Sequence, residues 1–283
     1  MCHLADTSYP LTMSRSSKVL AALTLVVALG AAGCSDDSST TATNDSTTTA
    51  ASTPSDTCTT EGDITVSAAA SLTESFTAIA DDIEEECDGA DITLTFDSSG
   101  KLSEQILSGA PVDVFASADE KNMDKVEDDQ ASTPEIFAKN NLVIVTKPGN
   151  PEGIKTLADL ADAGIVALCA EDAPCGNFAG QALESANVSI NESNVTRGEN
   201  AKATLAAVAE GDAVAGIVYV TDALAAAEST DSVEIPESNN VIASYPIARI
   251  NGPGSSELAQ LFVDRVLGPE GQKHLKDAGF LAP

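Results

Sequence analysis

Residues 67–76, SAAASLTESF, directly follow a short strand-like run at residues 63–66, DITV. Within this stretch, Ser71 and Glu74 have the spacing of a capping box, in which a serine and a glutamate satisfy the free amides that begin a helix. The stretch therefore predicts a junction between a strand and a helix. It leaves open whether Ser71 only begins the helix or also holds a ligand there.

Strand-like and helix-like segments alternate along the chain. Short runs rich in β-branched and aromatic residues predict strands at residues 64–66, 92–96, 112–115, 142–145, 165–168 and 214–220. Apolar residues at helical spacing predict helices near residues 72–83, 102–107, 156–161, 178–186, 200–210, 222–227 and 258–267. Ser117 and Glu120 form a second capping-box pattern and predict one more helix start. This alternation predicts an α/β fold with mostly parallel sheets.

The segment at residues 19–33 is apolar and follows basic residues. It is too short to span a bilayer comfortably and predicts the core of a signal peptide. Because it ends in small residues followed by Cys34, it resembles a bacterial lipoprotein signal, in which that cysteine carries the lipid. Ala31 stands where that pattern favours Leu, and an ordinary cleaved secretory signal is the alternative. Residues 1–34 are therefore expected to be a signal peptide, with Met13 as the natural start.

Residues 35–60 are dominated by Ser, Thr and Asp and contain no large apolar side chain. Such a segment cannot bury enough surface to offset the entropy cost of ordering it, so it predicts a disordered tether. The folded part is then expected to be residues 61–283. A chain of that length can form one large domain or two smaller lobes.

The formal net charge of −30 limits the possible partners. It argues against nucleic acid, because a basic surface supplies most of the affinity for phosphate backbones. The same charge argues against attraction to anionic lipid head groups. A small anion remains possible, since the oriented amides at a helix start can hold one without a positively charged side chain.

Of the six cysteines, one lies in the presequence and another is the expected lipid site. The remaining four, Cys58, Cys87, Cys169 and Cys175, predict disulfides in an exported protein and permit three connectivities. Cys58 precedes the first strand and Cys87 ends the first helix, and a helix that returns antiparallel to its strand brings these two ends together. We therefore expect the pair Cys58–Cys87, and with it Cys169–Cys175 across a short acidic loop.

Ligands of parallel α/β sheets bind beyond the carboxyl ends of the strands. The polar residues at the predicted strand-to-helix junctions are Ser71, Ser98, Ser99, the CGN run at residues 175–177, Asn200, Ala201 and Tyr219. Hydroxyls and helix-start amides dominate this set. The set favours binding over catalysis, because it lacks a nucleophile paired with a base.

Other chemistry has less support in the sequence. His3 and His274 are the only histidines, and neither lies near a serine or cysteine that could form a triad or a zinc site. The glycine-rich loops that bind dinucleotides or nucleotide phosphates are absent, so no cofactor and no metal is expected. A pair of carboxylates acting as in a glycosidase stays open, although the chain has no Trp that could form a sugar platform.

Four motifs, in this order and spacing, closely resemble the periplasmic molybdate-binding proteins of ABC transporters. They are SAAASLTESF, TFDSSGKLSEQI, GAPVDVFASADEKNMD and AGIVYVTDA, and the resemblance covers about residues 62–283. It implies a two-lobed periplasmic-binding-protein fold with a tetrahedral oxyanion held in a cleft between the lobes. We place the crossing strands near residues 140–146 and 244–250. Lobe 1 is then residues 61–139 and 248–283, and lobe 2 is residues 140–247.

The resemblance also implies a set of ligand-binding residues. The serine of its first motif matches Ser71, the second serine after the next strand matches Ser99, and the tyrosine of GIVY matches Tyr219. Two backbone amides of the second lobe fall at Cys175 and Ala201. Since molybdate is fully deprotonated near neutral pH, it needs only donors, which hydroxyls and helix-start amides supply. Ser71 is therefore expected to begin the helix and also to donate to the anion, with Ser98 as a supporting cap.

Together these features predict a lipid-anchored, extracytoplasmic, monomeric receptor, not an enzyme, that passes molybdate or tungstate to an ABC permease. Sulfate and phosphate are rival ligands for the same fold. Phosphate keeps a proton near neutral pH and needs an acceptor, which Asp97 could supply. A secreted hydrolase that uses carboxylates is the alternative of a different class.

Overall fold

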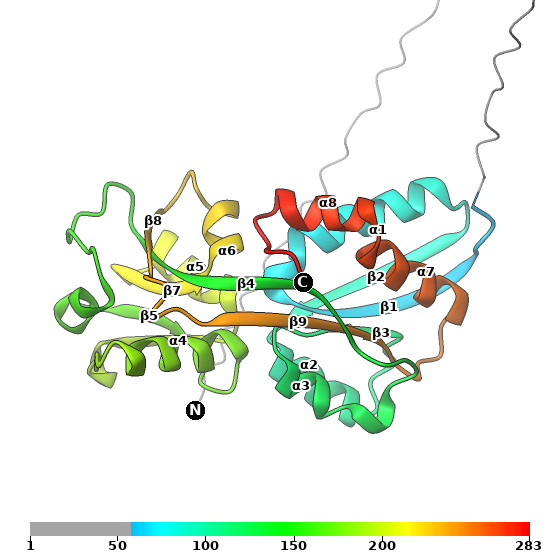
Figure 1. The fold of residues 1–283 in the computed structure, drawn as a ribbon, viewed down its shortest axis with the longest axis horizontal. Helices are drawn as coiled ribbons and strands as arrows, with labels where there is room; N and C mark the ends of the chain where they lie inside the picture. The colour runs from blue at the N-terminus through cyan, green and yellow to red at the C-terminus, as the bar shows by residue number, and fades with distance from the viewer. Residues whose placement is uncertain (1–57) are drawn as a thin grey trace, which may run out of the picture. The chain divides into compact units, whose positions relative to one another are not determined.

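The computed structural model describes residues 58–283, which belong to one compact unit, Pro54–Pro283 (Figure 1). The expected signal peptide, Cys34 and most of the expected tether lie outside the described residues. Among the residues that are described, no helix has the length and apolar composition needed to cross a membrane.

The described residues form an α/β fold in which nine strands are hydrogen-bonded in the order β2-β1-β3-β9-β4-β7-β5-β6, with β8 paired to β4. The strands are β1 (Gly62–Ala69), β2 (Ala90–Asp97), β3 (Val114–Ala116), β4 (Glu135–Thr146), β5 (Val166–Cys169), β6 (Val195–Gly198), β7 (Ala215–Tyr219), β8 (Asp231–Glu234) and β9 (Ile242–Arg249). The helices are α1 (Thr73–Glu86), α2 (Ser99–Leu107), α3 (Glu120–Asp124), α4 (Pro174–Ser185), α5 (Ala201–Ala209), α6 (Val220–Ala225), α7 (Ser256–Leu267) and α8 (Pro269–Asp277).

Two long strands, β4 and β9, connect the two halves of the sheet. They run side by side and antiparallel between the group that contains β1–β3 and the group that contains β5–β8 (Figure 1). The first half of β4 pairs with β9, and its second half, from Leu142 onward, pairs with β7 and β8. The segments predicted to cross between lobes lie in or overlap these two strands.

The expectation of a mostly parallel sheet needs a correction. The pairs β1–β2, β1–β3, β5–β6 and β5–β7 are parallel, whereas β3–β9, β4–β7, β4–β8 and β4–β9 are antiparallel. Every antiparallel pair includes one of the two crossing strands. The sheet is therefore mixed, with a parallel part in each half and antiparallel pairs where the chain passes between them.

The apolar stripe predicted for the first helix forms the centre of one core. Phe76, Ile79 and Ile83 of α1 are fully buried, and the Phe76 ring packs edge-on against Phe262 of α7 with their centroids 5.4 Å apart. Phe137 of β4 lies 5.7 Å from Phe76 by the same measure, so the crossing strand is part of this core. The sequence predicted a single C-terminal helix. The structure has α7 and α8, which meet at Gly268 and Pro269, because proline cannot donate the amide that a continuous helix would need.

Both capping boxes predicted from the sequence are wrong. A 3-10 turn at Ala70–Leu72 precedes α1, the N-cap of α1 is Leu72, and no side chain bonds to the cap. At α3 the N-cap is Asp119, whose side chain accepts from the Asn122 amide. In both places the serine hydroxyl has another partner: Ser117 donates to the Asp119 carbonyl, and Ser71 bonds to a tyrosine. Ser98, in contrast, is the N-cap of α2, as predicted.

Two disulfides have the connectivity expected from the sequence. Cys58 is bonded to Cys87, which directly follows the last residue of α1, so this bridge ties the segment before β1 to the end of α1. Cys169 at the end of β5 is bonded to Cys175 in the first turn of α4.

Candidate functional site

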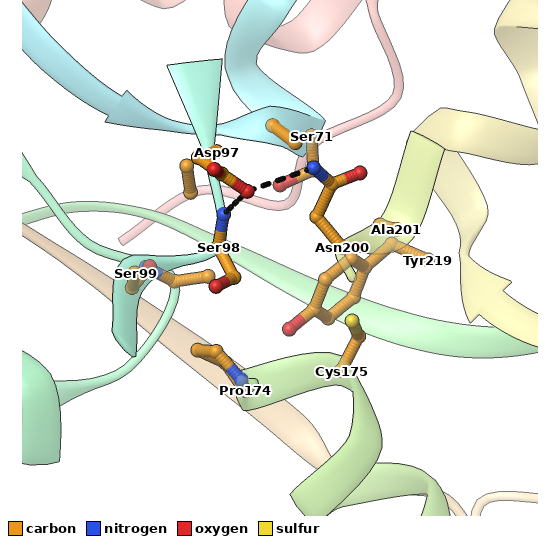
Figure 2. Close-up of a pocket in the computed structure, with 12 residues that line it drawn as sticks. Ser71, Asp97, Ser98, Ser99, Pro174, Cys175, Asn200, Ala201 and Tyr219 are labelled. Atoms are coloured by element: carbon orange, nitrogen blue, oxygen red, sulfur yellow. Dashed lines mark hydrogen bonds between the residues drawn. The ribbon is translucent and has the colours of Figure 1, made fainter. Parts of the chain in front are cut away.

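A small cavity lies beyond the carboxyl ends of β1, β2 and β7, where the 3-10 turn before α1 and the helices α2, α4 and α5 begin (Figure 2). It is lined by Ala69, Ala70, Ser71, Asp97, Ser98, Ser99, Ala118, Pro174, Cys175, Asn200, Ala201 and Tyr219. The structure thus brings all five predicted ligand residues, Ser71, Ser99, Cys175, Ala201 and Tyr219, to one place. The volume open to the centre of a water-sized sphere is about 10 Å³, near the minimum for one such sphere. In this structure the cavity therefore has room for about one water molecule.

The Ser99 hydroxyl is held in position by the backbone. Ser99 is the first residue of α2, is 1% exposed, and its Oγ accepts the Ala118 amide at 2.9 Å. Because the oxygen is used as an acceptor there, the hydroxyl proton is free to be donated elsewhere. Ser99 is therefore preorganised as a donor beside the cavity.

Ser71 has a partner that the sequence analysis missed. Its Oγ lies 2.9 Å from the hydroxyl of Tyr245, a fully buried residue of β9. When Tyr245 donates in this bond, the Ser71 proton is free for a ligand. Nothing in the local sequence indicates this pair, since 174 positions separate the two residues. Only the register of the crossing strand brings them together.

The Tyr219 hydroxyl is buried, and no hydrogen-bond partner for it exists among residues 58–283. Burial raises the pKa of this phenol well above its ordinary value, so the hydroxyl stays protonated and can donate. In Figure 2 it points toward the side of the cavity that Ser98 and Ser99 form. A buried polar group without a partner costs about 1–3 kcal/mol. This hydroxyl is therefore available to donate to an acceptor in the cavity.

Two helix starts provide backbone donors. Pro174 is the first residue of α4 and Cys175 the second, while Ala201 is the first residue of α5 after its N-cap, Asn200. The hydrogen bonds of the described residues leave the amides of Cys175 and Ala201 unpaired. The first amides of a helix lack acceptors in the preceding turn, and the helix dipole makes this end favourable for negative charge.

Asp97 lines the cavity, but other donors occupy its carboxylate. One oxygen accepts the Ser98 amide at 2.7 Å and the Asn200 side-chain amide at 3.0 Å. The other oxygen lies 3.7 Å from the Lys101 ammonium. Asp97 therefore joins the end of β2 to the start of α5, a role that the sequence did not indicate.

A second acid, Asp222 in the first turn of α6, is buried directly behind Tyr219. Its Oδ2 accepts the Tyr219 amide at 3.3 Å, and its Oδ1 lies 3.9 Å from the Lys202 ammonium. Burial raises the pKa of this carboxyl from 3.8 to about 7, although the Lys202 charge and the Tyr219 amide act in the opposite direction. The sequence analysis missed Asp222 because an acid in the first turn of a helix normally serves as an ordinary cap.

Full positive charges lie outside the cavity. Its twelve lining residues include no Lys, Arg or His. Lys101 pairs with Glu199, and Lys202 pairs with Glu74, so each ammonium bridges elements from the two halves of the sheet. Among the described residues, His274 bonds to Asp82 and not to the cavity, and no cluster of three His, Cys, Asp or Glu could hold a metal. The arrangement can bind an anion through neutral donors, but it pairs no nucleophile with a base.

The chain is similar to known bacterial binding proteins over most of its length. Residues 64–281 match the family model described as bacterial extracellular solute-binding protein. The molybdate-binding protein ModA of Mycobacterium tuberculosis (strain H37Rv) is 36% identical over 223 residues, which are 78% of this chain and 85% of that protein. ModA of Escherichia coli K12 is 33% identical over 231 residues, 78% of this chain and 89% of that protein.

The fold is similar as well. The periplasmic molybdate-binding protein of Azotobacter vinelandii superposes with a TM-score of 0.70, over 78% of this chain and 99% of that one, at 21% identity. This chain has a mixed α/β fold, and its two-lobe arrangement is consistent with such relatives. The matched segment extends from β1 to just beyond α8, so it includes every element that lines the cavity. The chain therefore belongs to the bacterial extracellular solute-binding protein family.

Proposed function

We propose that this protein binds molybdate or tungstate outside the cytoplasm and delivers the anion to the membrane permease of an ABC transporter. The two ModA relatives support the ligand class, since both are molybdate-binding proteins. The observation that carries the proposal is the buried Tyr219 hydroxyl, which lacks a partner within the described part of the chain and lies in a cavity whose other polar groups are mainly donors. A fully deprotonated tetrahedral anion supplies acceptors to Tyr219, Ser71, Ser99 and the amides of Cys175 and Ala201 at once.

The same donors argue against phosphate. Hydrogen phosphate needs an acceptor for its proton, and Asp97 is the carboxylate of the cavity. That carboxylate already accepts hydrogen bonds from Ser98 and Asn200 and pairs with Lys101. It is therefore poorly placed to accept a hydrogen bond from the phosphate proton. Sulfate carries no proton, so protonation does not distinguish it from molybdate. Because sulfate is smaller, we expect the distances between donors on opposite sides of the cavity to favour the larger anion.

The role is one of binding and release without turnover, by a monomer that holds the anion between two lobes. We take lobe 1 as residues 61–139 and 248–283 and lobe 2 as residues 140–247. The cavity is small for an anion with four oxygens, so we expect its walls in the bound protein to lie slightly farther apart than in this structure, although closer together than in the free protein in solution. Cys34 is proposed as the lipid anchor, because it follows the apolar segment 19–33 and precedes a polar one. Loss of membrane association in Cys34→Ala would support this anchor.

Calorimetric titration of the chain with molybdate, tungstate, sulfate and phosphate at equal ionic strength tests the proposal. Molybdate and tungstate should bind most tightly, sulfate more weakly and phosphate weakest. Tightest binding of phosphate would mean that Asp97 acts as an acceptor and that the ligand assignment is wrong. If none of the four anions binds, the receptor role fails and the carboxylate-based hydrolase becomes the better hypothesis.

A further inference from the structure

The Cys169–Cys175 disulfide lies against the cavity. Cys169 is the last residue of β5 and is fully buried, whereas Cys175 is 3% exposed and lines the cavity. The bond therefore closes the loop at residues 170–174 over the start of α4. The other disulfide, Cys58–Cys87, contributes no residue to the cavity lining.

The loop under this disulfide determines where the Cys175 amide lies. Ala173 donates to the Ala170 carbonyl at 3.0 Å, and the amides of Gly176 and Asn177 donate to the Ala173 carbonyl, each at 3.0 Å. A Cβ atom on Gly176 would lie only 2.0 Å from the Ala170 oxygen, so the loop and the helix start are in close contact. A shift of the loop would therefore move the first amides of α4.

The same disulfide also contacts the second helix start. The Thr204 hydroxyl in α5 lies 3.2 Å from Cys169 Sγ and also donates to the Asn200 carbonyl at 2.9 Å. Beside it, the Ala170 amide donates to the Gly198 carbonyl at 2.7 Å, just before α5. One covalent bond thus supports both helix starts, at Cys175 and Ala201, that line the cavity.

We propose that the Cys169–Cys175 disulfide positions these two amides, so that the affinity for the oxyanion depends on whether this bond is oxidised or reduced. The proposal rests on the oxyanion-binding function given above. Reduction by a dithiol proceeds by thiolate attack on one sulfur, which forms a mixed disulfide. The second thiol of the reagent then closes its own disulfide, and two protein thiols result from two electrons and two protons.

The linkage must also act in reverse. When the oxidised protein binds the anion more tightly than the reduced protein, bound anion favours the oxidised form by the same factor. A bound anion also covers the cavity side of Cys175. Molybdate should therefore protect Cys169–Cys175 from reduction and leave the reduction of Cys58–Cys87 unchanged.

A matched pair of double variants tests the proposal. Cys169→Ala/Cys175→Ala keeps both backbone amides but removes the bond beside the cavity, and Cys58→Ala/Cys87→Ala removes the distant one. By calorimetry, the first variant should bind molybdate about tenfold or more weakly, as expected when a hydrogen bond to a charged group is weakened. The second variant should lose thermal stability but keep its molybdate affinity. Equal molybdate affinities in the two variants would overturn the proposal.

A second measurement uses the wild-type protein and does not depend on the folding of a variant. The chain is treated with dithiothreitol with and without molybdate, its thiols are alkylated, and each cysteine pair is quantified by peptide mass. Protection of Cys169–Cys175 alone supports the proposal, and equal reduction with and without molybdate overturns it. If wild-type protein binds molybdate but shows no protection, only this inference fails. If wild-type protein binds none of the four oxyanions, the proposed function fails and this inference fails with it.

Discussion

The hydroxyl of Tyr219 combines a stability cost with a binding role. In the arrangement of this structure it is buried without a partner among residues 58–283, so its removal relieves a desolvation cost there. In the bound protein it would donate to an anion, a bond worth about 1.5–3 kcal/mol. We therefore predict that Tyr219→Phe weakens molybdate binding by about one to two decades, while the melting temperature of the free protein stays the same or rises. Calorimetry and a thermal melt measure the two effects. Unchanged affinity would show that the hydroxyl does not contact the ligand.

Asp222 should make stability depend on pH in an unusual direction. Its pKa is raised from 3.8 to about 7 on folding, so the folded state holds this proton more tightly than the unfolded state does. Its contribution to the free energy of unfolding is therefore greatest below about pH 4, falls as the pH rises to about 7, and is constant above that. Asp222→Asn should remove this pH-dependent loss, so its free energy of unfolding should rise relative to that of wild type as the pH increases through that window.

Urea unfolding of Asp222→Asn and wild type at several pH values measures this difference. Asp212→Asn, at an exposed acid, controls for the change in net charge. If the curves for Asp222→Asn and wild type run parallel from pH 4 to 7, burial of Asp222 has no such effect.

Single residues also show how far the sequence could predict the site. The local pattern could locate the junctions where Ser71, Ser99, Cys175, Ala201 and Tyr219 lie, because each stands where a predicted strand meets a predicted helix. The choice of these five among the other junction residues came from the resemblance to molybdate-binding proteins. Tyr245 could not be selected, because its contact with Ser71 depends on the register between distant strands. The capping boxes failed for a related reason: a short pattern shows which bonds a serine can make, but not which partners the fold brings to it.

At the scale of elements, the start of α4 depends on one glycine. A Cβ atom at Gly176 would lie 2.0 Å from the Ala170 oxygen and 2.9 Å from the Cys169 oxygen, both backbone atoms that cannot easily move away. We predict that Gly176→Ala displaces the first turn of α4, lowers the melting temperature and weakens molybdate binding.

Gly180, one turn later in α4, is a matched control. It is exposed, and a Cβ atom there would meet nothing within 4 Å. Gly180→Ala should therefore stabilise the protein by roughly 0.5–1 kcal/mol, because alanine favours a helix over glycine. Melts and calorimetric titrations of both variants test the pair. Similar effects of the two substitutions would mean that the loop does not constrain the helix start.

Two of the strands that the local pattern missed have weak apolar patterns. β6, with the sequence VTRG, and β8, with the sequence DSVE, contain partly or fully exposed residues, and they form because a neighbouring strand offers a free edge. The strands β5 and β7 have buried apolar runs, and both ends of each were predicted to within one residue. Burial leaves a clear pattern in a sequence, whereas pairing at an edge does not.

At the scale of the whole described unit, ion pairs cross between the two halves of the sheet. Lys101 in α2 pairs with Glu199 before α5, and Lys202 in α5 pairs with Glu74 in α1. Exposed pairs of this kind contribute about 0–1 kcal/mol each, and salt screens them. We therefore predict that, in the free protein, these ion pairs only modestly favour the arrangement in which the two lobes are closed on each other. The bound anion should supply most of the free energy that closes the lobes.

Small-angle scattering tests this expectation. Molybdate should lower the radius of gyration of the wild-type protein. Without ligand, the variant Lys101→Gln/Lys202→Gln should have a larger radius of gyration than wild type. Molybdate should remove most of this difference. Lys273→Gln, which breaks a pair within α8, is the control. An identical radius with and without molybdate would argue against closure of two lobes around the ligand.

The Cys58–Cys87 bridge has a mechanical consequence. Cys58 lies four residues before β1, so a pulling force on the chain upstream of it would otherwise peel β1 out of the sheet. With the bridge intact, such a force passes directly to the end of α1, and the 29-residue segment that contains β1 and α1 carries no load. This segment would be about 100 Å long if fully extended, and the bridge prevents it from being pulled out. The strand that leads to Ser71 is thus shielded from tension at the end of the molecule where an anchor would act.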